Sequence, residues 1–181
     1  MPMLTAATID EVRQAIGSVR ADGLRIGLVP TMGNLHEGHL SLIRAARIEC
    51  RYVVVSIFVN PTQFVAGEDY GSYPRTLESD FEACRAEGVD LAFAPKTEHV
   101  YPGDPLTTVH VAKLTETMCG AHRPGHFDGV TTVVAKLFNI VQPDAAYFGQ
   151  KDAQQAVVIK KMAADLFFPI EIVVCLSLIH I

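Results

Sequence analysis

Short apolar runs rich in β-branched residues alternate with stretches of helical periodicity along almost the whole chain. The pattern predicts strands at 26–29, 52–59, 89–93, 145–148 and 170–174, an additional strand at 107–111, and helices at 8–21, from 36 onward, at 77–84, 130–141 and 153–166. Strands separated by helices favour a parallel sheet with right-handed crossovers. The sequence therefore predicts an α/β fold, a doubly wound, Rossmann-like parallel sheet with helices on both faces.

The segment Val29–Leu40 joins a buried strand to a helix and holds two histidines three residues apart. A helix N-terminus presents unpaired N–H groups and a partial positive charge, so it suits a phosphate. His36 and His39 lie about one turn apart and could reach the same anion. Gly38 leaves room for a planar group such as a nucleotide base. The alternative is a plain strand-to-helix turn with two surface histidines.

Composition limits the class of protein. The chain has 181 residues, 49% hydrophobic and 19% charged, which indicates one globular domain. The formal charge of −5 argues against a nucleic-acid partner. We expect no membrane association and a cytoplasmic location, because no apolar run could span a bilayer and no secretory signal is visible.

The cysteines are widely spaced and form no CxxC pair: Cys50, Cys84, Cys119 and Cys175. Buried or free thiols are therefore expected rather than a disulfide or a metal site. His36 and His39 could ligate zinc in principle, but His-Glu-Gly-His lacks the spacing of the HExxH helix.

Five blocks occur in a fixed order between residue 29 and about residue 155. They are Val-Pro-Thr-Met-Gly-Asn-Leu-His-Glu-Gly-His-Leu at 29–40, Ile-Phe-Val-Asn-Pro-Thr-Gln-Phe at 57–64, Tyr-Pro-Arg-Thr at 73–76, Gly-Ala-His-Arg-Pro-Gly-His-Phe-Asp-Gly-Val at 120–130, and Tyr-Phe-Gly-Gln-Lys-Asp with the following Gln-Gln at 147–155. The first block resembles the HIGH signature of the nucleotidyltransferase superfamily. The set together resembles the pantothenate synthetase (pantoate–β-alanine ligase) family.

The resemblance implies a two-step reaction. The carboxylate of pantoate attacks the α-phosphate of ATP and releases pyrophosphate, and the amine of β-alanine then attacks the pantoyl-adenylate to give pantothenate and AMP. It also implies ATP as co-substrate, Mg²⁺, and a homodimer formed through this domain. Residues 1–175 correspond to the family's N-terminal nucleotide-binding domain. Residues 176–181 depart from the family, whose chain continues into a smaller domain, and resemble a truncation that ends in a few foreign residues.

The resemblance assigns the ATP site to two segments, Met32, Gly33, Asn34, Leu35, His36, Glu37, Gly38 and His39, and Gly149, Gln150, Lys151 and Asp152. Within them, His39 is the catalytic residue on the reacting phosphate. Lys151 is a point charge at a strand end and suits a phosphate. Asp152 could receive a ribose hydroxyl or cap the following helix.

The resemblance assigns Gln63 and Gln155 to the substrate acid.

Asp80 could lie near a Mg²⁺ that bridges phosphates, or could be a solvated charge on its helix. Arg123 and His126 lie in a Gly/Pro-rich loop, where we expect them to shape the cleft wall without a catalytic role.

Two other functions stay open. A plain nucleotidyltransferase would share the histidines but would not need Gln63 and Gln155. A fragment that binds nucleotide or dimerises without turnover is the non-enzymatic alternative.

Overall fold

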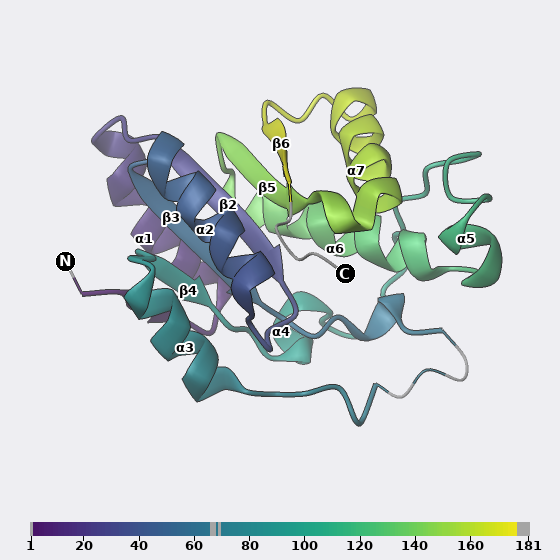
Figure 1. The fold of residues 1–181 in the computed structure, drawn as a ribbon, viewed down its shortest axis with the longest axis horizontal. Coiled ribbons are helices and arrows are strands. Elements are labelled where there is room, and N and C mark those ends of the chain that lie inside the picture. The colour runs from purple at the N-terminus through teal and green to yellow at the C-terminus, as the bar shows by residue number, and fades with distance from the viewer. Residues whose placement is uncertain (1, 66–67, 69, 177–181) are drawn as a thin grey trace.

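A computed structural model describes residues 2–65, 68 and 70–176 (Figure 1). Its six-stranded sheet has the order β1-β4-β3-β2-β5-β6, and every neighbouring pair is parallel. The strands are β1 Leu4–Ala6, β2 Ile26–Thr31, β3 Tyr52–Ile57, β4 Leu91–Phe93, β5 Ala145–Gly149 and β6 Glu171–Cys175. The helices are α1 Ile9–Ala21, α2 Glu37–Glu49, α3 Leu77–Ala86, α4 Thr97–Val100, α5 Cys119–His122, α6 His126–Val141 and α7 Ala153–Asp165, with 3₁₀ turns η1 Pro61–Gln63 and η2 Gln150–Asp152.

Helices cover both faces of the sheet, as Figure 1 shows. The buried residues of α1, α6 and α7 form one apolar cluster with one face, and those of α2 and α3 form a second cluster with the other. Val12 and Phe138 are core residues of the first cluster, and Ile43 and Cys84 are core residues of the second. The prediction of a doubly wound α/β fold is confirmed.

Several details differ from the sequence-based expectation, among them short elements that were not expected and strand ends that lie up to two residues away. β1, at the sheet edge beside β4, was not expected, because three residues give too short a pattern to recognise. The strand expected at 107–111 was wrong: Val109 bonds to the side chains of Thr131 and Thr132 on α6 instead of to a strand. α6 begins at His126 rather than at residue 130, because Gly125 enters the helix with a φ of 84° before the apolar periodicity starts.

The sheet places the site at one edge. β2 lies between β3 and β5, and its outgoing helix α2 and the outgoing helix α7 of β5 pack on opposite faces. The position between β2 and β5, where the helices that follow neighbouring strands change from one face to the other, is the topological switch point, and ligands bind there in open α/β sheets.

Among the described residues, no helix is long and apolar enough to cross a membrane.

Candidate active site

The turn after β2 is shaped by two consecutive left-handed residues, Gly33 with a φ of 82° and Asn34 with a φ of 51°. The chain then enters α2, whose N-cap is His36. The Gly38 N–H donates to His36 Nδ1 at 3.1 Å, and the His36 N–H donates to His39 Nδ1 at 3.4 Å. The two imidazoles thus form a capping box, with ring centroids 4.2 Å apart.

This capping fixes the tautomers. Because both Nδ1 atoms accept backbone N–H groups, a neutral ring must carry its proton on Nε2. Burial and the neighbouring His36 lower the pKa of His39 to about 4, with Lys151 adding to the decrease and Asp80 opposing it. At neutral pH, His39 is therefore an uncharged donor through Nε2. Met32 and His39 line the same cavity as Asp152, so the turn after β2 and the turn after β5 face one another.

Asp80 lies beneath the same turn. Its carboxylate accepts the N–H of Asn34 at 3.0 Å, the N–H of Leu35 at 2.8 Å and the hydroxyl of Thr76 at 3.2 Å. Only 2% of Asp80 is exposed, so the alternative of a solvated surface charge is wrong. A Cβ at Gly33 would lie 2.9 Å from Asp80 Oδ2, and the turn therefore closes on this carboxylate only with glycine there. The arrangement is a backbone concavity filled by an anion from the protein itself.

Several predicted site residues meet at a cavity of about 160 Å³ at the carboxyl ends of β2 and β5. They come from three separate segments of the chain, namely Met32 and His39, Gln63, and Asp152 and Gln155. The volume suits a small molecule rather than a whole nucleotide, since pockets for drug-sized ligands begin at about 300 Å³.

The amide of Gln63 has a defined orientation in this cavity. The Thr62 N–H can only donate, so the atom of Asn60 that it meets at 3.4 Å is the carbonyl Oδ1. Asn60 Nδ2 then donates to Gln63 Oε1 at 3.1 Å, and Gln63 Nε2 lies 3.0 Å from the sulfur of Met32. Gln63 consequently presents N–H donors to the cavity, which suits the oxygens of an acid.

The turn after β5 holds the remaining candidates. Asp152 occupies the N-cap position of α7 but makes no side-chain cap hydrogen bond, which leaves its carboxylate free to accept a hydroxyl. Lys151 is exposed beside it. Gln155 lines the cavity, whereas Gln154 faces away and bonds to Cys119 N, Leu114 O and Thr117 O.

Other predicted residues lie outside the cavity walls. Gly149 and Gln150 end β5 and begin η2, and His36 and Asn34 are exposed on the turn. Glu37 pairs with Arg44 along α2 at 2.5 Å instead of facing the cavity.

Sequence reasoning did not assign the apolar wall. One face of α6 lines the cavity with Val130, Val133, Val134 and Leu137. The i, i+3, i+4, i+7 spacing of these residues was visible, but the same spacing is typical of core packing. Buried Asn60, at 1% exposed, was also unassigned, and its position directly after a strand was the available signal.

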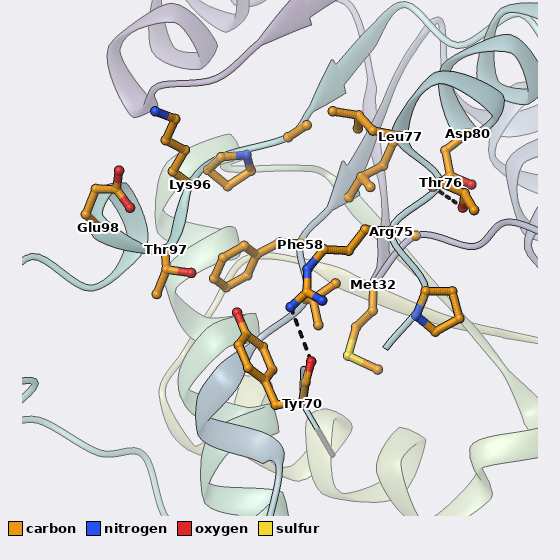
Figure 2. A pocket seen from close by; sticks show the side chains of 16 residues that line it. Met32, Phe58, Tyr70, Arg75, Thr76, Leu77, Asp80, Lys96, Thr97 and Glu98 are labelled. Carbon is orange, nitrogen blue, oxygen red and sulfur yellow. Dashed lines mark hydrogen bonds between the residues drawn. The ribbon is translucent and has the colours of Figure 1, made fainter. Parts of the chain in front are cut away.

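A larger cavity of about 430 Å³ adjoins the first and shares Met32 and Phe58 with it (Figure 2). Figure 2 shows Arg75 directed toward Tyr70, whose carbonyl it bonds at 3.2 Å. Because His39, Gln63 and Gln155 line only the smaller cavity, we take the smaller cavity as the reaction site.

Metal ligands are sparse in the described part of the chain. It holds no cluster of three or more His, Cys, Asp or Glu side chains suited to a metal ion. All four cysteines are free, with Cys50 and Cys84 buried. Within the described residues, the Asp80 carboxylate already accepts two N–H groups and a hydroxyl, so we interpret it as a support of the turn rather than as a magnesium ligand.

The fold and the cleft together define a Rossmann-like α/β domain with its polar site at the topological switch point. The family model described as pantoate-beta-alanine ligase matches residues 4–178. The chain therefore belongs to the pantoate-beta-alanine ligase family.

Individual relatives agree. A pantothenate synthetase of Moorella thermoacetica is 63% identical over 166 residues, which cover 92% of this chain and 59% of the relative. One of Thermoanaerobacter sp. (strain X514) is 60% identical over 171 residues, which cover 94% and 60%. The chain thus spans about 60% of the length of these curated relatives.

Solved structures show the same fold. The pantothenate synthetase of Thermus thermophilus matches with a TM-score of 0.91 at 51% identity, covering 96% of this chain and 61% of that one. The pantoate-beta-alanine ligase of Francisella tularensis, described as complexed with beta-gamma ATP and beta-alanine, matches with a TM-score of 0.92 at 41% identity, covering 96% and 66%.

Proposed function

We propose that this chain forms the acid- and ATP-binding part of an AMP-forming ligase that condenses pantoate with β-alanine. The observation that carries the proposal is the meeting of His39, Gln63 and Gln155 at one small cavity, in a chain 63% identical to a pantothenate synthetase.

The cavity matches the chemistry of pantoate. This acid has a carboxylate and two hydroxyl groups around a carbon that bears two methyl groups. Gln63 and Gln155 offer amide groups for the oxygens, and the apolar face of α6 offers Val133 and Val134 for the methyl groups. A cavity of about 160 Å³ is in keeping with a molecule of this size.

The first step then needs positioning and charge stabilisation rather than a base. A carboxylate oxygen of pantoate forms a bond to the α-phosphorus of ATP, and the bond to the pyrophosphate oxygen breaks. The neutral His39 donates Nε2–H to a phosphate oxygen, and Lys151 adds a positive charge at the facing turn. In the second step the β-alanine amine, which has given its ammonium proton to water, forms a bond to the pantoyl carbonyl carbon. The bond from that carbon to the AMP oxygen breaks, AMP leaves, and the remaining excess proton on nitrogen passes to water.

We infer that Mg²⁺ enters with the ATP phosphates. Mg²⁺ commonly keeps several waters and substrate phosphates among its ligands, so a protein cage is not required. The homodimer and the cytoplasmic location expected from the sequence stay predictions, testable by light scattering and by cell fractionation.

Titration calorimetry of this chain with pantoate and with ATP tests the binding part of the proposal. Pantoate-dependent pyrophosphate release and β-alanine-dependent AMP release test the chemistry, for this chain and for a chimera completed with the C-terminal part of the Moorella relative. Binding of pantoate and both releases by the chimera are expected. A chain that binds ATP but shows no affinity for pantoate would contradict the proposal.

The same assays decide between this activity and a nucleotidyltransferase that does not ligate. Pyrophosphate release with no dependence of AMP formation on β-alanine would favour the nucleotidyltransferase. The paired glutamines and the apolar wall favour the ligase, because transfer to a nucleotide acceptor uses neither.

A further inference from the structure

A chain of polar contacts behind Gln63 is not used by the mechanism above. His126, only 7% exposed at the first position of α6, places Nδ1 2.8 Å from the backbone carbonyl of Gln63. Arg123 Nη1 lies 3.0 Å from His126 Nε2. Glu68 binds the other side of the Arg123 guanidinium at 2.7 and 2.8 Å.

These partners leave His126 with one allowed protonation state. A carbonyl oxygen can only accept, so Nδ1 must carry a proton and donate it to Gln63. A guanidinium can only donate, so Nε2 must be the bare acceptor of the Arg123 N–H. His126 is consequently neutral and in the Nδ1–H tautomer, the opposite of the tautomer that the helix cap imposes on His39.

The backbone of η1 packs against α6 and is held by side-chain hydrogen bonds. A Cβ at Gly129 would lie 2.4 Å from Thr62 O and 2.6 Å from Gln63 Cα, so η1 rests directly on the backbone of α6. Asn60 orients the Gln63 side chain. His126 bonds through Nδ1 to the backbone carbonyl of Gln63, so it ties the residue that carries the amide to the start of α6.

We propose that His126 is a positioning residue for the acid substrate, which acts by holding Gln63 through its Nδ1–H, with Arg123 and Glu68 fixing its tautomer. This inference rests on the proposed function, because it assumes that Gln63 binds the acid.

The proposal implies a dependence on pH. The groups that face His126 are Arg123, Glu68, the Gln63 carbonyl, Asp152 across the cleft, and the ring of Phe127 at 5.1 Å. Burial lowers the pKa of His126 below its ordinary value; Arg123 acts in the same direction, and the Gln63 carbonyl, Glu68 and Asp152 act against it. Protonation of His126 would place an Nε2–H against the N–H donors of Arg123. We therefore expect the affinity for pantoate to fall at acidic pH.

Binding measurements on four chains test the role. His126→Ala should raise the Kd for pantoate about tenfold, the cost of one buried hydrogen bond, and leave the Kd for ATP within about twofold. His126→Asn should restore most of the affinity, because its amide can donate from the place of Nδ1, and should remove the loss of affinity at acidic pH. His122→Ala is the matched control, an exposed histidine at the end of α5 that should change nothing.

Long-range ¹H–¹⁵N NMR of the imidazoles gives a second readout without any substrate. The His126 signals should show Nδ1 protonated and Nε2 bare at about pH 7. A protonated Nε2, or pantoate binding that ignores His126→Ala, would overturn the inference while leaving the proposed function intact. Absence of pantoate binding by the unsubstituted chain would overturn both.

Discussion

Asp80 Oδ1 accepts the backbone N–H of Leu35 at 2.8 Å, although the two residues are 45 positions apart. The bond joins the first turn of α3 to the turn that leads into α2, and the carboxylate's second oxygen accepts the N–H of Asn34. The conformation of the histidine turn is therefore held by a charge on another helix, and Asp80 is better described as part of the turn than as a metal ligand.

Asp80→Ala should destabilise the protein by about 3 kcal/mol, because two partly buried N–H groups lose their carboxylate acceptor. Urea unfolding measures this loss, and ATP titration of the folded variant should show weaker binding. Glu78→Ala, in the same helical turn but exposed, is the control and should change stability by less than about 0.5 kcal/mol. Equal effects of the two substitutions would exclude the supporting role of Asp80.

His39→Ala, made in the chimera with the C-terminal part of the Moorella relative, should reduce pantoate-dependent pyrophosphate release by about 10²–10³-fold, because a donor aimed at the reacting phosphate is lost. The protein should stay folded. His39→Asn separates the two functions of the ring, since it can still accept the His36 N–H but has no group at Nε2. We expect it to be as inactive as His39→Ala and closer to the unsubstituted protein in stability. A loss below about threefold would remove His39 from the chemistry.

Gln63→Ala should raise the requirement for pantoate far more than that for ATP. Removal of the amide leaves oxygens of the acid without a donor, at about 1–3 kcal/mol, or roughly tenfold or more in KM. Gln154→Ala is the matched control, because this glutamine bonds to the segment 114–119 and faces away from the cavity. Equal increases for both substrates would instead indicate that the loop after Asn60 has been distorted.

The free energy of unfolding should decrease as the pH is lowered through the range in which His39 is protonated. The pKa of His39 is about 4 in the folded protein and about 6.5 when unfolded, so the unfolded chain takes up the proton first. The contribution of neutral His39 is complete above about pH 6.5 and is lost as the pH falls toward 4. Urea unfolding at pH values between about 7.5 and 4 gives the free energy of unfolding as a function of pH. The slope of this dependence should be smaller in His39→Asn by up to about 1.4 kcal/mol per pH unit. Identical slopes would contradict the low pKa.

Much of the site could be predicted because the carboxyl ends of parallel strands meet at one edge. His39 follows β2, Gln63 follows β3 and Gln155 follows β5, so their meeting needed only the strand pattern and the five blocks. The hydrogen bond between His126 and the Gln63 carbonyl could not be predicted, because it joins residues 63 positions apart. It depends on how η1 packs against α6.

Local pattern also failed where one sequence fits two environments. The run Thr-Thr-Val-His-Val at 107–111 alternates as an edge strand does, but it is held by hydroxyls of α6. Asp80 shows the same ambiguity, since a carboxylate in the first turn of a helix is usually solvated and only the burial of the turn against it reveals its partners.

The histidine cap restricts which nucleophiles the two imidazoles can activate in the first step. Both rings of the turn have committed their lone pairs to backbone N–H groups, so neither is free to remove a proton. An alcohol or a thiol would arrive there protonated and stay inert, whereas a carboxylic acid is already ionised at neutral pH. In the first step, discrimination between acids and hydroxyl compounds would then begin at the histidine turn, which offers no free lone pair to a hydroxyl proton.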